Sequence, residues 1–345
     1  MQIINVLKSI RKNILDLQPY SSARDEFSGE AMVFLDANEN PFNEPYNRYP
    51  DPLQRQLKNE IAKIKKCDQE QIFLGNGSDE PIDIAVRAFC TPGIDNIISI
   101  DPTYGMYKVA ADINNVEVKK VQLSDDFQLI TEDILNKADQ NTKLIFLCSP
   151  NNPSGNLFKK NDILKIINEF QGVVIIDEAY IDFAPEASML PELNKYPNII
   201  IFQTFSKAWG MAGIRLGMAF ADPQIIKIFN KIKYPYNINI LTQQKAIEQI
   251  KQEQKKNEWV SILLEEKQKM ADKLATLPNS VKVYPSNANF LLVKMKDARS
   301  IYNKLVETGV IVRDRSKIAL CNDCLRITIG TEEENNILLK EISKL

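Results

Sequence analysis

The sequence contains no histidine among its 345 residues. This absence excludes a serine or cysteine nucleophile that is activated by an imidazole base, and it excludes histidine as a metal ligand. General acid–base chemistry must therefore use a lysine, a tyrosine or a carboxylate. Cysteine is scarce as well, and five scattered cysteines without a secretory signal indicate reduced thiols rather than a disulfide framework.

A strong charge of one sign and a long apolar run are also missing. The formal net charge is −2, so no positive field favours nucleic acid or an anionic membrane. No apolar stretch approaches the roughly 20 residues of a membrane span, and the first ten residues lack the apolar core of a signal peptide. Cys321 and Cys324 have the spacing of half a zinc site, but no second pair accompanies them. We therefore expect a cytoplasmic protein without a metal, a membrane or a nucleic-acid partner.

The most informative residue that is present is a lysine at the end of an expected buried strand. Lys207 follows the apolar run 198–202 and the hydroxyl of Ser206, and Arg215 lies eight residues further on among glycines. An amine beside ligands for a phosphate suits Schiff-base chemistry with pyridoxal phosphate. Taken alone, the residue would fit an ordinary solvated lysine equally well.

Two further apolar runs end in polar side chains that complete this chemistry. The run 172–176 leads to Asp177, whose carboxylate would keep the pyridine nitrogen of the cofactor protonated, although it would also fit a helix N-cap. The strand 143–148 leads into a turn in which Asn152 would donate a hydrogen bond to the phenolic oxygen of the cofactor. Both residues lie where buried parallel strands open onto a crevice.

These motifs resemble those of the class I and II aminotransferases of fold type I, which use pyridoxal phosphate. Ser154 stands where the family usually has threonine, a change that keeps the hydroxyl group. Each motif is weak alone, but together they cover nearly the whole chain in the family's order. The matching segments are 36–41, 48–51, 102–107, 152–155, 177–183, 206–215 and 324–331.

The resemblance, together with the alternation of strands and helices, implies an α/β fold with a mainly parallel sheet between helices and a smaller α+β domain. We expect an N-terminal arm (1–40) that packs on the small domain, a large cofactor-binding domain (41–245) and a small domain (246–345). A long charged helix from 242 to about 277 would link the two domains. The small domain would contain strands at 281–284, 290–293, 310–312 and 325–329, and a last helix that is opened by a capping box of Thr331 and Glu334.

The resemblance also implies a role for each residue of the cofactor site. Lys207 would bind the cofactor covalently and then move the proton of the substrate α-carbon, Asp177 would pair with the pyridinium, and Tyr180 would join Asn152 at the phenolic oxygen. Tyr104 would stack on the ring. The cofactor phosphate would be held by Ser78, Asp79, Thr204, Ser206, Arg215 and, from a neighbouring subunit, Tyr49. Tyr49 implies a homodimer with shared active sites.

On the substrate side, the resemblance implies a site that accepts both a carboxylate and a phosphate. Arg326 matches the anchor of the α-carboxylate, and a guanidinium fork suits either anion. Arg313 and Tyr20 would hold the phosphate of the substrate, and Asn38 would line the same pocket. The loop after Arg313 also carries Arg315, so the phosphate role falls on either of these two arginines. Ordinary surface ion pairs would explain the same arginines without any ligand.

The implied reaction is a transamination of histidine biosynthesis, in which L-histidinol phosphate and 2-oxoglutarate give 3-(imidazol-4-yl)-2-oxopropyl phosphate and L-glutamate. Two alternatives of the same fold remain, namely an aminotransferase for aromatic amino acids and a threonine-phosphate decarboxylase. A non-catalytic regulator fused to a DNA-binding module is disfavoured, because the resemblance begins near Tyr20 and leaves no room for a preceding winged helix.

Overall fold

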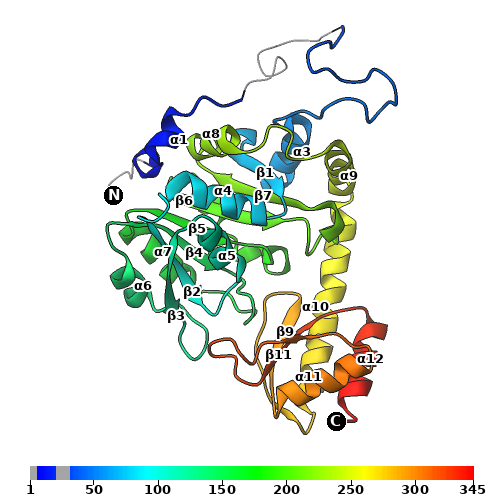
Figure 1. Ribbon diagram of the computed structural model, residues 1–345. Coiled ribbons are helices and arrows are strands. Elements are labelled where there is room, and N and C mark those ends of the chain that lie inside the picture. Colours follow the sequence, from blue (N-terminus) through cyan, green and yellow to red (C-terminus); the bar gives the residue numbers. More distant parts are fainter. Residues whose placement is uncertain (1–5, 21–31) are drawn as a thin grey trace.

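The computed structural model describes residues 6–20 and 32–345, and it has two lobes (Figure 1). The large lobe (residues 55–250) contains one seven-stranded sheet. Its strands are β1 (Ile72–Asn76), β2 (Asn96–Asp101), β3 (Glu117–Gln122), β4 (Thr142–Cys148), β5 (Val173–Asp177), β6 (Ile199–Thr204) and β7 (Leu216–Ala221). They lie in the order β1-β7-β6-β5-β4-β2-β3, and within this sheet only β7 is antiparallel to its neighbours. The expectation of a mainly parallel sheet is confirmed.

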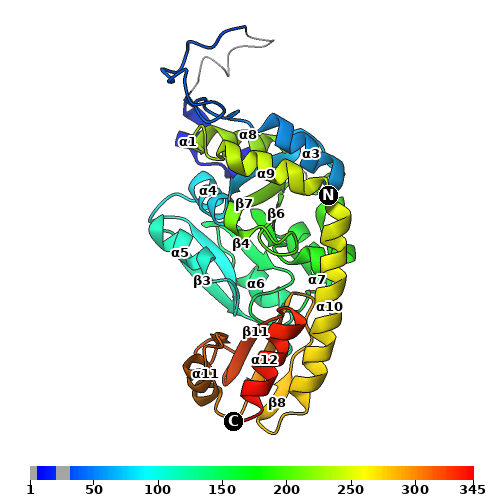
Figure 2. The same ribbon diagram turned by 90° about the vertical axis from the view of Figure 1, so that its right-hand side faces the viewer.

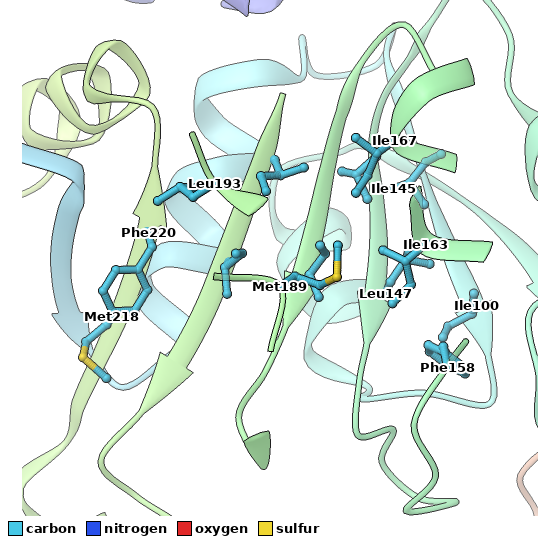
Figure 3. Close-up of a cluster of buried hydrophobic side chains, with 14 of the residues drawn as sticks. Ile100, Ile145, Leu147, Phe158, Ile163, Ile167, Met189, Leu193, Met218 and Phe220 are labelled. Carbon is cyan, nitrogen blue, oxygen red and sulfur yellow. The ribbon is translucent and has the colours of Figure 1, made fainter. Parts of the chain in front are cut away.

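Helices cover both faces of this sheet. One face is covered by α3 (Arg55–Lys65), α6 (Thr131–Lys137), α7 (Lys160–Glu169) and α9 (Ile240–Ile250), and the other by α4 (Asp79–Phe89), α5 (Met106–Ile113) and α8 (Pro223–Ile232). In β4, Ile145 and Leu147 belong to the core of the first face, where they lie near Ile163 of α7 (Figure 3), and Leu144 and Phe146 belong to the core of the second. Since successive strand residues point to opposite faces, such strands must be apolar at every position, which explains the continuous runs in the sequence.

Strand β7 is the element of this sheet that the sequence did not predict. It alternates large residues with Gly217, Ala219 and Ala221, and glycine and alanine are depleted in strands. The small residue has a structural reason at Gly217, where an added Cβ would lie 2.3 Å from the backbone carbonyl carbon of Gly77. Because β7 lies close to the turn after β1, position 217 requires glycine, and this glycine weakens the strand pattern of the sequence.

The first described segment contradicts the expectation that the N-terminal arm packs on the small domain. In residues 6–20, a 3-10 helix (Val6–Ser9) and α1 (Lys12–Asp16) lie against α8 of the large lobe (Figure 1). The backbone N–H of Arg11 donates to the carbonyl of Ala88 at 3.0 Å, and Lys231 Nζ donates to the carbonyl of Leu15 at 2.6 Å. Ile10 is buried in the core of the second face, which anchors the segment there.

The small lobe (residues 253–345) carries an antiparallel sheet in the order β10-β11-β9-β8. Its elements are α10 (Glu253–Ala275), β8 (Ser280–Val283), β9 (Phe290–Met295), α11 (Ala298–Glu307), β10 (Arg313–Asp314), β11 (Cys324–Thr328) and α12 (Glu332–Ile342). The expected strand at 310–312 is wrong, because Val310 N–H still bonds back to Leu305 of α11 and the ladder begins only at Arg313. The capping box of Thr331 and Glu334 at the start of α12 is confirmed.

The expected single helix from 242 to about 277 is two helices. Helix α9 ends at Ile250, and α10 begins at Glu253 after a turn at 251–252. Helix α9 packs on α3, whereas α10 runs from the large lobe to the end of the small lobe (Figure 2). The turn at 251–252 therefore allows α9 to pack on the large lobe and α10 to extend to the small lobe. No helix within residues 6–20 and 32–345 is long and apolar enough to cross a lipid bilayer.

Candidate active site

A cavity of about 380 Å³ lies where the carboxyl ends of β4, β5 and β6 face the small lobe. The predicted site residues that line it are Ser78, Asp79, Tyr104, Asn152, Asp177, Tyr180, Thr204, Ser206, Lys207, Arg215, Arg313 and Arg326. The structure therefore gathers residues that are almost 250 positions apart in the sequence around one volume. The cavity is also lined by Cys148, Ala179, Ala212 and Arg315.

Three predicted residues lie elsewhere in this single chain. Asn38 and Tyr49 line a separate cavity of about 420 Å³, in which the ring of Tyr49 stacks on Tyr236 at 4.5 Å between centroids. Tyr20 is 72% exposed and does not line the cavity that holds Lys207. Within one protomer, Tyr20 and Asn38 do not join the cavity that holds Lys207, and Tyr49 was assigned to the site of a neighbouring subunit rather than to this one.

The Asp177 carboxylate lies at the end of β5 and is almost completely buried. The Tyr107 hydroxyl of α5 donates to its Oδ2 at 2.6 Å, and the backbone N–H of Ala179 donates to its Oδ1 at 3.0 Å. Burial raises the pKa of Asp177, and these two hydrogen bonds oppose that rise. The Ala179 bond resembles the N-cap interaction that the sequence allowed, but the buried position in the cavity also suits a partner for a cation.

Asn152 connects the two lobes at the cavity. Its Nδ2 donates to the Tyr180 hydroxyl at 3.3 Å, and its Oδ1 accepts from Arg326 Nη1 at 2.6 Å. Burial raises the pKa of Tyr180 further above its ordinary value, so the phenol stays protonated at neutral pH. The amide therefore bridges a phenol of the large lobe and a guanidinium of the small lobe.

Lys207 follows β6 and extends into the cavity, with Nζ 5.5 Å from the centre of the Tyr180 ring. Loss of water around the amine and the positive charge of Arg326 lower the pKa of Lys207, although the charge of Asp177 opposes this. A lowered pKa increases the neutral fraction of the amine, which is the form that attacks a carbonyl group and accepts a proton.

An anion-binding cradle lies at the start of α4. Gly77 has a φ of +67°, and Ser78 is the N-cap residue but its side chain makes no cap hydrogen bond. The free N–H groups of a helix N-terminus favour a phosphate. Arg215 Nη2 lies 3.5 Å from Asp79 Oδ2, and an added Cβ on Gly77 would lie 2.5 Å from the same Nη2 atom.

Two hydroxyl groups at the end of β6 and just after it complete this cradle. Thr204 Oγ1 lies 3.0 Å from Ser206 Oγ, and it also accepts from the backbone N–H of Ser206 at 3.1 Å. Both hydroxyl groups line the same cavity as Ser78 and Arg215. The cradle thus offers hydroxyl, backbone and guanidinium donors, which is the donor set that binds a phosphate monoester.

The family of the chain follows from its sequence when it is compared with known proteins. Residues 33–342 match the family model described as aminotransferase class I and II. The chain belongs to the class I and II aminotransferases. A histidinol-phosphate aminotransferase of Bacteroides fragilis is 58% identical over 335 residues, which are 97% of each chain. Another histidinol-phosphate aminotransferase, from Flavobacterium johnsoniae, is 50% identical over 348 residues, with 100% of each chain covered.

Solved structures show the same fold. The histidinol-phosphate aminotransferase of Clostridium acetobutylicum superposes with a TM-score of 0.80 at 26% identity, over 87% of this chain and 90% of that one. The Sinorhizobium meliloti enzyme, solved in complex with pyridoxal-5'-phosphate, superposes with a TM-score of 0.79 at 23% identity, over 86% and 82% of the two chains. The expected fold type I architecture is confirmed.

Class I and II aminotransferases depend on pyridoxal phosphate, and the residues of this chain fit that group. The space beside Gly77 and Ser78 would hold the phosphate, and the buried carboxylate of Asp177 would face the ring nitrogen. Lys207 would bind the aldehyde carbon, and Asn152 with Tyr180 would face the phenolic oxygen. The fit rests on a buried carboxylate, a cationic cradle and a lysine that line one cavity.

Two residues at the candidate site escaped the sequence interpretation. Tyr107 lay inside a matched motif, but nothing in its spacing indicated that its hydroxyl would reach a carboxylate 70 positions away. Arg315 was recognised only as a possible substitute for Arg313, yet both arginines line the cavity. The alternation of side chains along an extended strand, which places residues two apart on the same face, is the signal that would have found it.

Proposed function

We propose that this chain transfers an amino group between L-histidinol phosphate and 2-oxoglutarate, giving 3-(imidazol-4-yl)-2-oxopropyl phosphate and L-glutamate. The observation that carries the proposal is that Arg326, an anchor for a substrate anion, opens on the same cavity as the Lys207 amine. The names of the relatives, which match over nearly their full length, support the choice of substrate. They also favour this reaction over decarboxylation of threonine phosphate and over transamination of aromatic amino acids.

Each residue has a defined task in this proposal. Pyridoxal phosphate, when bound, supplies an electron sink for the negative charge that develops at the substrate α-carbon. Lys207 takes the proton from that carbon, and its lowered pKa suits the task near neutral pH. The Asp177 carboxylate holds a negative charge at the end of β5, where it is buried and lines the cavity. Arg326 binds the substrate anion and so orients the α-carbon hydrogen toward Lys207.

The test is a set of half-reactions followed by absorbance. Glutamate and histidinol phosphate should each convert the bound cofactor to its aminated form, whereas phenylalanine should do so less efficiently. Release of carbon dioxide from threonine phosphate would favour the decarboxylase. A cofactor spectrum that does not respond to histidinol phosphate, in protein that responds to phenylalanine, would refute the proposed substrate.

Arg326→Ala should weaken glutamate and histidinol phosphate together, because we propose that one guanidinium binds an anion of both. Loss of a charge-assisted hydrogen bond predicts a rise in KM of about 10- to 100-fold for each substrate. The matched control is Arg87→Ala, which removes an arginine that pairs with Asp83 at 3.1 Å on the surface of α4. A rise for only one of the two substrates would contradict the shared anchor.

We further propose a homodimer in which Tyr49 reaches the site of the partner subunit. Tyr49 is 50% exposed, and so are Tyr46 at 60%, which lines the same cavity, and Phe42 at 76% and Tyr234 at 78%, which lie close in sequence to Tyr49 and to its stacking partner Tyr236. Such a concentration of exposed aromatic residues is typical of an interaction surface. Tyr49→Ala should weaken cofactor retention, and sedimentation should give twice the mass of one chain.

We propose the cytoplasm as the compartment and a division into domains at residues 41–245 and 246–345. All five cysteines are free thiols, four of them buried, which suits a reducing environment. The two sheets, which lie on either side of the turn at 251–252, support the domain division. Limited proteolysis that releases stable fragments near this turn would test it.

A further inference from the structure

Strand β1 lies at one edge of the seven-stranded sheet and leads into the anion-binding cradle at the start of α4. Among the described residues it pairs with β7 alone, so one side of its backbone has no strand partner. Two side chains occupy this side instead. The carbonyl of Leu74 accepts from Asn237 Nδ2 at 2.9 Å, and the backbone N–H of Asn76 donates to Glu80 Oε2 at 2.5 Å.

Glu80 accepts hydrogen bonds with both oxygens of its carboxylate. Its Oε2 accepts from the backbone N–H of Asn76 at 2.5 Å and from Asn76 Nδ2 at 3.1 Å. Asn237 Nδ2 lies 3.1 Å from Oε1 and 3.2 Å from Oε2. All of these partners are donors, so an ionised carboxylate, which only accepts, satisfies them. An amide in place of the carboxylate would turn an N–H group toward one of these donors.

Asn237 belongs to the segment between α8 and α9, and it contacts β1 with its backbone as well as its side chain. In addition to the bonds to Leu74 and Glu80, its carbonyl accepts from Asn76 Nδ2 at 2.6 Å. Its Oδ1 accepts from Gln54 Nε2 at 3.2 Å, and Gln54 is almost completely buried. Both polar groups of the Asn237 side chain thus have partners, which fixes one orientation of the amide.

The turn after Asn76 is held from the other side by β7. The backbone N–H of Gly77 donates to the carbonyl of Arg215 at 2.8 Å. Gly77 and Ser78 are the residues beside which the cofactor phosphate would bind. An anion binds more tightly to donors that are already fixed in direction, because less of the chain must be ordered on binding. Affinity for the phosphate should therefore depend on the contacts that hold this turn.

The charge of Glu80 alone would act against a phosphate. Glu80 lies two residues after Ser78, in the first turn of α4. A carboxylate there reduces the positive potential that a helix N-terminus offers to an anion. Its charge and its hydrogen bonds thus have opposite effects on the binding of the cofactor. Water and salt screen the repulsion at this half-buried position, whereas the bonds act at contact distance, so the hydrogen bonds should dominate.

We propose that Glu80 and Asn237 are positioning residues for the cofactor phosphate. Together they replace the missing strand partner of β1 and fix the turn at 76–78, so that its donors are in place when the cofactor binds. Neither residue lines the cavity that holds Lys207, so both act through the turn. This inference does not depend on the substrate of the proposed function, because it concerns the cofactor alone.

The test compares the binding of pyridoxal phosphate with that of pyridoxal, which lacks the phosphate. Both are titrated into the cofactor-free full chain and followed by absorbance. Glu80→Gln should raise the Kd for pyridoxal phosphate by about 10-fold or more, the lower end of the range for a charge-assisted hydrogen bond. The Kd for pyridoxal should change by less than about threefold, because pyridoxal has no group in the cradle.

Asn237→Ala should act in the same direction, and its effect should be smaller in the Glu80→Gln background because the two side chains share one network. The matched control is Asn239→Ala. Asn239 Oδ1 accepts from the backbone N–H of Thr242 at 2.8 Å, so this variant loses the cap of α9 instead of a bond to β1. It should leave both Kd values within about twofold.

A Kd for pyridoxal phosphate that stays unchanged or falls in Glu80→Gln would show that positioning does not outweigh charge, and it would overturn the proposal. Equal increases for pyridoxal phosphate and pyridoxal would show a purely structural role and overturn it as well. Strictly additive effects of Glu80→Gln and Asn237→Ala would contradict the shared network. These measurements use no substrate, so the proposed function can fail while this inference stands, and the reverse.

Discussion

Tyr107→Phe tests whether the buried hydrogen bond to Asp177 sets the proton affinity of that carboxylate. The substitution removes one hydroxyl from a fully buried ring that also stacks on Phe146 at 4.7 Å, so the packing of the ring is kept. A hydrogen bond to a charged group contributes about 1.5–3 kcal/mol. Loss of this bond disfavours the charged carboxylate, so the variant should raise the pKa of Asp177 further.

The sign of the effect on stability follows from the direction of that shift. Burial already raises the pKa of Asp177 above its ordinary value in the folded protein. A carboxyl group with a raised pKa lowers the free energy of unfolding as pH rises from the unfolded pKa through the folded one. Tyr107→Phe widens this interval, so cofactor-free variant and wild type should differ little in acid and by about 1.5–3 kcal/mol at pH 8.

The assay is urea unfolding of cofactor-free protein at several pH values between 5 and 8. Asp177→Asn removes the charge of the carboxylate. In that background, Tyr107→Phe should lower the free energy of unfolding by less than about 1 kcal/mol at every pH. A gap between wild type and Tyr107→Phe that is independent of pH, or that persists undiminished in the Asp177→Asn background, would refute the reasoning.

Three further predictions concern the cavity and its supports. Gly217→Ala should lower the free energy of unfolding in urea by more than about 2 kcal/mol, because its Cβ would collide with the backbone of Gly77. Gly213→Ala is the control and should be tolerated, because its Cβ would meet nothing within 4 Å. Equal effects of the two substitutions would contradict the packing argument. Burial raises the pKa of Glu178 to about 7. Ionisation of this group should therefore lower the free energy of unfolding of the wild type by about 3 kcal/mol between pH 4.5 and pH 8, and Glu178→Gln should remove this contribution to the pH dependence. Borohydride should fix the cofactor to Lys207, as peptide mass spectrometry can show, and Lys207→Ala should lose turnover and release its cofactor on dialysis; labelling of any other lysine would contradict the assignment.

The cofactor residues at strand ends were predictable because two simple rules converge on them. A strand covered on both faces must be apolar along its length, so a polar residue at the end of such a run, as at Asp177 and Asn152, is conspicuous. The carboxyl ends of parallel strands also meet at one edge of a sheet, which places these residues near each other. Lys207 lies just beyond β6 and follows the same rules.

The residues that the sequence did not place depend on tertiary contacts that have no local signal. Tyr107 meets Asp177 only because α5, which packs on β2 and β3, brings this hydroxyl to the end of β5. The first described segment meets α8 and its core through Ile10 and Lys231. Strand β7 was missed partly because the close approach of Gly217 to Gly77 requires a glycine in place of a strand former. Local propensity is a weak guide wherever such packing decides the residue type.

The division of tasks between the two lobes has a consequence for how this active site can change. The cofactor residues belong to the large lobe, whereas the arginines proposed to bind the substrate lie on the hairpin β10–β11 of the small lobe. Asn152 joins the two sets through its hydrogen bond to Arg326. Substitutions at Arg313 or Arg315 should therefore alter substrate choice without disturbing proton transfer by Lys207. A substitution at Asn152 should disturb both, because it removes the support of Arg326 and the donor to Tyr180 in one step.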